Sequence, residues 1–190
     1  MSGALGYVLA MAVGYLIGSL NPAAAIARLR GVDLRGSGSG NPGATNAART
    51  MGRWVGITVG LLDVLKGLVP AAVFTALVGQ SAGEIAGLAA VVGHITSPFL
   101  KGRGGKGVAT ALGAILGTHA WWALPVLAAF ALVVALTRRI GLGAVAAAVV
   151  LIPTAIVMSD SWHTRIVAIF IAVLIVVRHQ SNLRTAMRRE

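Results

Sequence analysis

Long apolar stretches dominate this chain, and short polar segments separate them. The apolar stretches occur at about seven places, several of them shorter than the ~20 residues that cross a ~30 Å hydrocarbon layer as a helix. They cover residues 5–29, 54–78, 83–100, 107–122, 123–137, 142–158 and 165–177. The pattern predicts an all-α integral membrane protein with about seven transmembrane helices.

The distribution of positive charge predicts the orientation of these helices. The first stretch lacks a basic leader and a clear cleavage site, which favours a retained helix over a signal peptide. With the N-terminus outside and about seven crossings, every Lys and Arg except Lys66 and Arg165 lies inside, including Arg139 and Arg189. If residues 107–122 were re-entrant, the basic tail would lie outside, against the positive-inside rule. We therefore expect a cytoplasmic C-terminus.

A high apolar content supports the membrane assignment. Of the 190 residues, 57% are hydrophobic and 11% are charged, and the mean hydropathy is +0.85. The longest polar stretch, residues 31–53, is too short to form a core of its own. We therefore expect one polytopic membrane domain over residues 1–190.

Charge and residue content exclude several function classes. The net charge of +11 would suit nucleic acid, but the basic residues lie between membrane stretches, so we expect no nucleic-acid partner. The chain has no cysteine, and its 5 acidic residues are dispersed along the sequence. We therefore expect no metal site, which argues against phosphotransferases that need a cluster of carboxylates.

Three polar segments carry the candidate chemistry, and the predicted topology places all of them on the cytoplasmic side. They are the first polar segment (residues 38–46), the second (101–107) and the third (178–184). The first two are rich in glycine, whose backbone N–H groups can converge on phosphate oxygens, and Arg or Lys lies in or beside all three. The pattern predicts a composite anion site.

The first polar segment can turn tightly and then enter a helix whose N-terminus faces a ligand. Arg49 and Arg53 follow at helical spacing and favour an anion site, although they would also suit membrane anchors. A flexible loop is the alternative interpretation. The candidate phosphate-binding residues here are Gly40, Asn41, Gly43, Thr45 and Asn46.

The second polar segment resembles a Walker A loop only superficially. Leu100 stands where that motif needs its first glycine, and Gly107 follows Lys106 where it needs Ser or Thr. An ATPase is therefore disfavoured, but a phosphate-binding turn with a point charge at a helix start fits the pattern. The candidates here are Gly104, Gly105, Gly107 and Lys106, with His94, Ser97 and Arg103 as supporting residues.

The third polar segment presents His179 and Asn182 on one face if it is helical, because the two are three residues apart. A basic tail without a binding role is the alternative. Within the second apolar stretch, Asp63 and Lys66 have the same spacing and would be costly to bury separately. We expect them to pair or to face the helix bundle, and a proton or ion path is the sharper hypothesis.

Taken together, the polar segments resemble the motifs of the acyl-phosphate-dependent glycerol-3-phosphate acyltransferases of bacteria, the PlsY family. The matching parts are residues 38–46 followed by Arg49, residues 93–110, and His179 with Asn182. All three motifs occur in order, and the resemblance covers essentially the whole chain. One part departs from the family pattern: residues 140–143 read Ile-Gly-Leu-Gly, where the family often has a serine.

The resemblance implies a bacterial inner-membrane enzyme with its active site at the cytoplasmic face. Such enzymes transfer a fatty acyl group from acyl phosphate to the carbon-1 hydroxyl of glycerol 3-phosphate, giving lysophosphatidic acid and phosphate in the first acylation of phospholipid synthesis. The implied partners are acyl phosphate, glycerol 3-phosphate, membrane lipid and an upstream enzyme that forms acyl phosphate. No cofactor is implied. The implied catalytic residues are Ser39, Arg49, Lys106, His179 and Asn182.

Two other function classes remain compatible with the composition. A basic inner vestibule and an intramembrane Asp63–Lys66 pair would suit a transporter or channel for an anionic phosphorylated metabolite. Inverted repeats are not visible, however, and the polar groups cluster at one face and not at the midplane. A lipid-binding protein without chemistry would explain the basic rim but not the ordered glycine segments and the His179–Asn182 pair.

Overall fold

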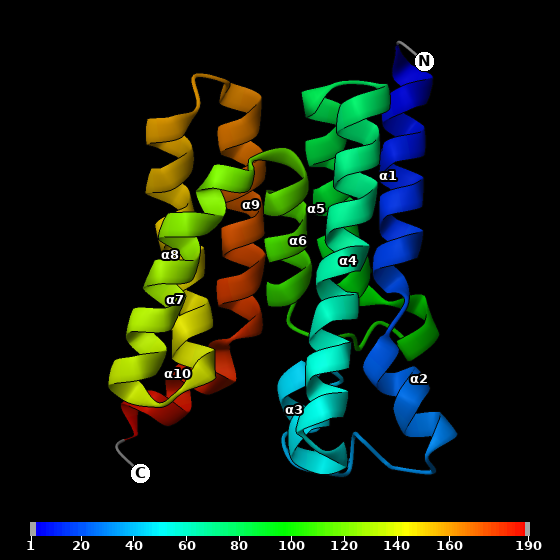
Figure 1. Ribbon diagram of the computed structural model, residues 1–190, viewed down its shortest axis with the longest axis vertical. Helices are drawn as coiled ribbons and strands as arrows, with labels where there is room; N and C mark the ends of the chain where they lie inside the picture. Colours follow the sequence, from blue (N-terminus) through cyan, green and yellow to red (C-terminus); the bar gives the residue numbers. More distant parts are fainter. Residues whose placement is uncertain (1–2, 189–190) are drawn as a thin grey trace. The chain divides into compact units, whose positions relative to one another are not determined.

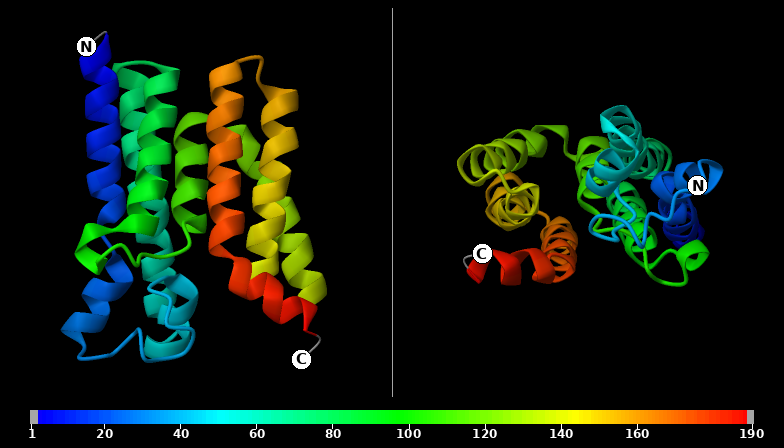
Figure 2. Two further views of the ribbon diagram at one scale, coloured as in Figure 1. Left: turned by 180° about the vertical axis from the view of Figure 1, so that it is seen from behind. Right: turned by 90° about the horizontal axis from the view of Figure 1, so that it is seen from below.

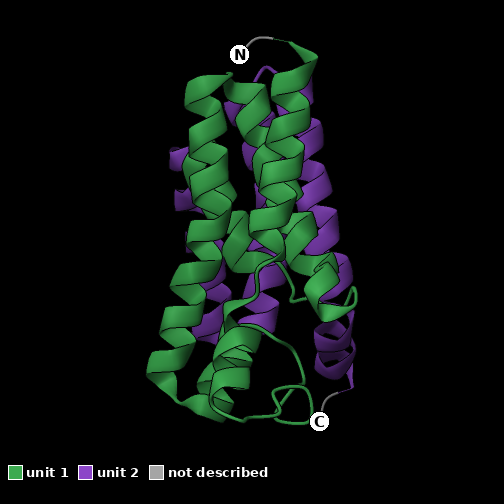
Figure 3. Ribbon diagram, turned by 90° about the vertical axis from the view of Figure 1, so that its right-hand side faces the viewer, with its two compact units in different colours: residues 1–118 green, residues 119–190 purple. Residues whose placement is uncertain are grey.

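The computed structural model describes residues 3–188, and every regular element in this part of the chain is a helix. The chain divides into two compact units, residues 1–118 and residues 119–190 (Figure 3). Arg189, which we expect on the cytoplasmic side, lies outside the described residues. Whether the two units form one domain, as the sequence suggests, stays a prediction.

Unit 1 is built from helices, with a long loop over residues 30–43 between α2 and α3 (Figure 1). Helix α1 packs against α5, α5 against α4, and α4 against α6. The short helices α2 and α3 lie together at one end of the unit (Figure 1). The elements are α1 (Ala4–Ser19), α2 (Pro22–Leu29), α3 (Ala44–Met51), α4 (Arg53–Leu77), α5 (Gln80–Thr96), η1 (Pro98–Leu100) and α6 (Val108–Thr118).

The first apolar stretch is interrupted where α1 ends and α2 begins. Leu20 is extended there, and Pro22 is suited to the first turn of a helix because it lacks an N–H group. Asn21 caps α2, since its side-chain Oδ1 accepts a hydrogen bond of 2.8 Å from the backbone N–H of Ala24. The stretch predicted over residues 5–29 is therefore two helices in sequence.

Small residues let the helices of unit 1 approach one another closely. A Cβ atom at Gly14 or Gly18 of α1 would collide with the carbonyl of Ala86 or Ala90 on α5. Between α4 and α6, a Cβ at Gly67 would collide with the carbonyl of Thr110. Packing through small residues is a common way to join helices in a membrane, where apolar burial alone gives little driving force.

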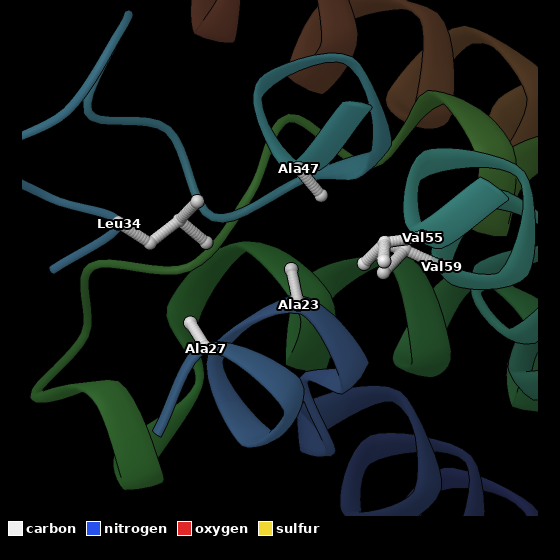
Figure 4. Close-up of a cluster of buried hydrophobic side chains, with 6 residues drawn as sticks. All are labelled: Ala23, Ala27, Leu34, Ala47, Val55 and Val59. Carbon is white, nitrogen blue, oxygen red and sulfur yellow. The ribbon is translucent and has the colours of Figure 1, made fainter. Parts of the chain in front are cut away.

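The end of unit 1 that carries α2 and α3 has its own small core. Figure 4 shows the buried side chains of this cluster, which come from α2, the loop after it, α3 and the start of α4. Leu34 is the one member from the loop, and it anchors residues 31–43 to the helices. The cluster consists of Ala23, Ala27, Leu34, Ala47, Val55 and Val59.

Unit 2 follows the chain as consecutive helices, with α8 packed between α7 and α9. Arg138 ends α7 in the left-handed conformation, with φ of 58°. At His179 the chain bends by 55° between α9 and α10 (Figure 2). The elements are η2 (Ala120–Trp122), α7 (Ala123–Thr137), α8 (Ile140–Met158), α9 (Trp162–Arg178) and α10 (Gln180–Met187).

The helices agree with an all-helical integral membrane protein. In the described part of the chain, 5 helical stretches are long and apolar enough to cross a membrane, or up to 6 if α9 and α10 form one bent span. Helix α6, within the stretch predicted over residues 107–122, is apolar but shorter, and it ends at Thr118. The all-α membrane fold is confirmed, whereas seven crossings and their orientation stay predictions.

Candidate functional site

The first polar segment is held in shape by one buried side chain. Asn46 is 1% exposed, and its Oδ1 accepts a hydrogen bond of 2.8 Å from the Ser39 N–H. Its Nδ2 donates to the carbonyls of Leu34 and Ser37, both at 3.1 Å. Gly38 has φ of 61° and lies so close to Asn46 Oδ1 that a Cβ would collide with it. In the described structure, the Asn46 amide therefore shapes the loop.

A second asparagine ties this loop to the break between α1 and α2. Asn21 Nδ2 donates a hydrogen bond of 3.0 Å to the carbonyl of Pro42, while its Oδ1 caps α2. The amides of Gly40 and Gly43 donate to the carbonyls of Ser37 and Asn41 at 3.1 and 2.9 Å. These two glycine N–H groups thus hold turns of the loop, where the sequence suggested that they lie open to phosphate.

The exposed face of the first segment carries the groups that can meet a ligand. Ser39 and Thr45 are exposed, and Asn41 is partly exposed. Arg49 is also exposed and lies one helical turn after Thr45 on α3, so the two share a helix face. Helix α3 starts after Gly43 without a side-chain cap. The Thr45 hydroxyl and the Arg49 guanidinium therefore lie on the same face of one short helix.

The second polar segment is a compact turn whose amides are also engaged. Gly102 donates to the carbonyl of Ser97, Gly104 to that of Ile95 and Gly105 to that of His94, at 2.9, 2.9 and 3.1 Å. The glycines permit this path, because a Cβ at Gly104 or Gly105 would collide with His94. Their role in the described structure is close approach and turn formation, and not an open row of N–H donors.

Lys106 follows this turn at the entry to α6. It is partly exposed, and Gly107 after it has φ of 85° and begins the helix by accepting from the Ala111 N–H at 2.8 Å. Arg103 is exposed on the outside of the turn, and its carbonyl accepts a hydrogen bond from the Arg35 guanidinium. Arg35, in the loop just before the first polar segment, therefore links that loop to the second polar segment.

Beneath the second segment lies a buried set of charged side chains. Lys66 Nζ is 3.0 Å from Asp63 Oδ1, and His94 Nδ1 is 3.5 Å from the same oxygen. The exposed fractions of Asp63, Lys66 and His94 are 2%, 7% and 4%. The predicted Asp63–Lys66 pair is confirmed, and His94 joins it from α5.

Ser97 forms a hydrogen bond inside unit 1. It is fully buried, and its Oγ donates a hydrogen bond of 2.7 Å to the carbonyl of Ser19 at the end of α1. The sequence suggested Ser97 as a supporting residue beside the turn, but it did not predict the bond to Ser19 at the end of α1. The Asn-Pro pair at residues 21–22 was the signal available for that break.

In unit 2, His179 lies at the bend between α9 and α10 and is 3% exposed. Its Nδ1 is 2.8 Å from the carbonyl oxygen of Ile175. A carbonyl can only accept, so Nδ1 carries the hydrogen and the neutral ring has its lone pair on Nε2. Nε2 is therefore the atom of His179 that can take up a proton.

Asn182 lies on the first turn of α10, directly against the backbone of α8. A Cβ at Gly141 would collide with the side-chain Nδ2 of Asn182, and its Cγ is also within contact distance. Residues 140–143 are the part of the sequence that departs from the family pattern. Gly141 in this part has no side chain and so leaves room for the side chain of Asn182. His179 is the N-cap residue of α10 and Asn182 lies in its first turn, while a face shared by the two side chains stays a prediction.

These features define a class of protein. The described residues contain no group of three or more His, Cys, Asp or Glu side chains that could hold a metal ion. The apolar helices carry cationic, glycine-rich turns, together with a histidine whose Nε2 can accept a proton. Such an arrangement suits a membrane-embedded enzyme that handles phosphorylated substrates by positioning and charge.

Comparison with known proteins identifies the family. The family model described as "Glycerol-3-phosphate acyltransferase" matches residues 8–189. A glycerol-3-phosphate acyltransferase of Geobacter sulfurreducens is 44% identical, over 95% of this chain and 93% of that protein. Glycerol-3-phosphate acyltransferase 1 of Deinococcus radiodurans is 40% identical, over 93% and 90%. The chain belongs to the glycerol-3-phosphate acyltransferase family of enzymes, as the sequence motifs indicated.

Solved structures give the same result. The crystal structure of PlsY, an integral membrane glycerol 3-phosphate acyltransferase, in its glycerol 3-phosphate form has a TM-score of 0.92 and 34% identity. The match covers 96% of this chain and 92% of the PlsY chain. The lysophosphatidic acid form of PlsY has a TM-score of 0.89 and 33% identity, with the same coverage. The fold is therefore that of PlsY.

The contact between Gly141 and Asn182 yields a test. We expect Gly141→Ala to lower acyltransferase activity at least tenfold, because the new methyl group displaces Asn182, and a misplacement of about 1 Å in an active site can cost roughly a hundredfold in rate. The melting temperature in detergent should change little, since alanine is a better helix former than glycine. Activity and thermal unfolding of the purified variant are the measurements.

The matched control is Gly60→Ala, where the nearest atom to the new Cβ is the Ala44 Cβ, in ordinary contact at 3.6 Å. This variant should keep its activity. Full activity in Gly141→Ala would show that the close approach of Asn182 is not needed for turnover.

Proposed function

We propose that this acyltransferase uses acyl phosphate as its donor and forms lysophosphatidic acid and inorganic phosphate. The observation that carries the proposal is the likeness, across nearly the whole chain, to PlsY structures in glycerol 3-phosphate and lysophosphatidic acid forms. These two molecules are the acceptor and the product of such a transfer. The donor assignment rests on the motifs that this chain shares with the acyl-phosphate-dependent family.

The chemistry requires one bond to form and one to break. The carbon-1 hydroxyl oxygen of glycerol 3-phosphate attacks the acyl carbonyl carbon, and the bond from that carbon to the phosphate oxygen breaks. The hydroxyl proton ends on the released phosphate, either directly or through Nε2 of His179. Acyl phosphate is a mixed anhydride with a good leaving group, so positioning and charge stabilisation can supply most of the rate.

The cationic and hydroxyl groups take the binding roles in this proposal. Lys106 and Arg49 meet phosphate oxygens, and the exposed hydroxyls of Ser39 in the loop and Thr45 on α3 add contacts. Charge-assisted hydrogen bonds of this kind are about twice as strong as neutral ones. The glycines support these side chains by shaping the turns, because their own amides are engaged with carbonyls.

His179 and Asn182 serve the same reaction from unit 2. Ile175 fixes the His179 tautomer with Nε2 as the acceptor, which suits a group that receives the hydroxyl proton. Asn182 can orient the acceptor hydroxyl through its amide. The enzyme is proposed to lie in the bacterial inner membrane, with the phosphate chemistry at the cytoplasmic boundary, where the acyl chain stays in the lipid layer and the soluble acceptor arrives from water.

Donor use is the first test. Purified protein in lipid vesicles should convert acyl phosphate and glycerol 3-phosphate into equal amounts of lysophosphatidic acid and phosphate, and an excess of chelator should leave the rate intact. Acyl coenzyme A and acyl carrier protein should give no turnover. Chromatography of the lipid product and a phosphate assay are the measurements. Turnover with a thioester and none with acyl phosphate would overturn the donor assignment, and chemically unchanged substrates would point to transport.

Removal of the phosphate-binding cations is the second test. Lys106→Ala and Arg49→Ala should each lower kcat/KM by roughly tenfold to more than a hundredfold, because each deletes a charge-assisted hydrogen bond worth ~1.5–3 kcal/mol. Steady-state kinetics with both substrates varied would measure the loss. Arg188→Ala is the control, since Arg188 is exposed and lies just after α10. Equal losses in all three folded variants would favour general electrostatic attraction over specific contacts.

Topology is the third test, and the cysteine-free sequence makes it direct. Single cysteines at Arg30 and Arg188, both exposed, should react with a membrane-impermeant thiol reagent only after the cells are permeabilised. A cysteine at the exposed Asp160 should react in intact cells. The expectation follows from the concentration of Lys and Arg on the cytoplasmic side. Labelling of Arg188→Cys in intact cells would reverse the proposed placement of the C-terminus.

A further inference from the structure

The buried side chains of Asp63, Lys66 and His94 have no part in the chemistry described so far. Asp63 and Lys66 lie inside α4, a helix long and apolar enough to span a membrane. Charged groups in such a place are costly unless they are paired, and in membrane proteins they usually have a functional reason. The contacts of Lys66 and His94 show what this buried group holds in place.

Lys66 donates a hydrogen bond to a backbone carbonyl that has no helical partner at the end of α1. In an uninterrupted helix, the carbonyl of Leu20 would accept from the N–H of Ala24, but that N–H donates to Asn21 Oδ1 instead. Lys66 Nζ supplies the missing donor at 2.7 Å from the Leu20 carbonyl. Its other contact is Asp63 at 3.0 Å, so the ammonium group is held from two sides.

His94 connects the same carboxylate to the second polar segment. Its Nδ1 is 3.5 Å from Asp63 Oδ1, and its backbone carbonyl accepts the Gly105 N–H at 3.1 Å. The ring itself lies under the turn, since a Cβ at Gly105 would collide with His94 Nε2. The next residue along the chain is Lys106. The imidazole ring thus packs directly against the turn before Lys106, so a change in the ring's orientation would move the turn.

We propose that Asp63 is a positioning residue that fixes the His94 ring and thereby the direction in which the turn presents Lys106 to a phosphate. The inference rests on the proposed function only in assigning Lys106 to phosphate. Asp63 itself is 2% exposed and touches no substrate in this account. A contact network that runs from α4 through α5 to the glycine turn carries its effect.

The first experiment separates positioning from simple charge pairing. Asp63→Asn leaves the Lys66 ammonium buried without its carboxylate, so the melting temperature should fall and the KM for glycerol 3-phosphate should rise at least tenfold. Adding Lys66→Met removes the stranded charge together with the donor to the Leu20 carbonyl, so the double variant should regain only part of the lost melting temperature. Its KM should stay raised, because His94 still lacks its carboxylate. Recovery of both the melting temperature and KM in the double variant would overturn the proposal.

Amide hydrogen exchange gives a readout that does not depend on catalysis. In the wild-type enzyme, the Gly104 and Gly105 amides are protected by their bonds to the Ile95 and His94 carbonyls. Exchange in a peptide covering residues 102–107 should be at least tenfold faster in the double variant. Unchanged exchange there would overturn the proposal even if activity fell. Full activity in Lys106→Ala, together with faster exchange over residues 102–107 in the double variant, would separate the two ideas. It would refute the proposed contact between Lys106 and phosphate but support the positioning of the turn by Asp63.

Two further variants keep the test decisive. His94→Ala leaves the Asp63–Lys66 pair in place and removes only the ring, so it stays informative if Asp63→Asn does not fold. It should raise both KM and exchange over residues 102–107, and wild-type values for both would contradict the inference. Glu84→Gln is the matched control, because Glu84 is a carboxylate on α5 that is 4% exposed and lies about 15 Å along the helix from His94, at 1.5 Å per residue. It should leave exchange over residues 102–107 unchanged, and faster exchange there would show that any buried carboxylate has this effect.

Discussion

The requirement that every backbone carbonyl in an apolar environment finds a donor governs unit 1. Helix α1 breaks at Leu20, and a break at this depth leaves carbonyls without their helical partners. Two distant side chains supply the donors: Lys66 bonds to the Leu20 carbonyl, and Ser97 bonds to the Ser19 carbonyl, both at 2.7 Å. The break thereby becomes a junction at which α1, α4 and the end of α5 are joined, and the first two polar segments are bonded to residues beside it through Asn21 and Ser97.

The glycines of the polar segments illustrate how one residue type serves two different needs. A glycine-rich turn can expose N–H groups to an anion, or it can let the backbone pass close to another group. Gly104 and Gly105 do the second, because they lie against His94 and donate to carbonyls. Gly38 does the same against Asn46. In this acyltransferase these glycines shape the turns, because their small size lets the backbone pass close to His94 and Asn46.

The sequence predicted the class of fold and the family, because hydropathy and motif order are both local properties of the chain. It also predicted the Asp63–Lys66 pair, since a three-residue spacing on a helix brings two side chains together. It did not predict that His94 joins the pair or that Lys66 bonds to Leu20. Those contacts depend on how α4 and α5 pack against the end of α1, which no local pattern encodes. The place of Asn182 against Gly141 was hidden for the same reason.

The bond from Arg35 to the Arg103 carbonyl links two segments that are far apart in the sequence. Neither segment has a secondary-structure ladder to hold it, so each loses conformational entropy when it becomes ordered. The bond couples the two segments, so a ligand that orders one of them also partly orders the other. A second ligand that binds to the other segment then loses less conformational entropy on binding. Two substrates that bind to opposite ends of this link would therefore bind cooperatively, with no change in the shape of the helices.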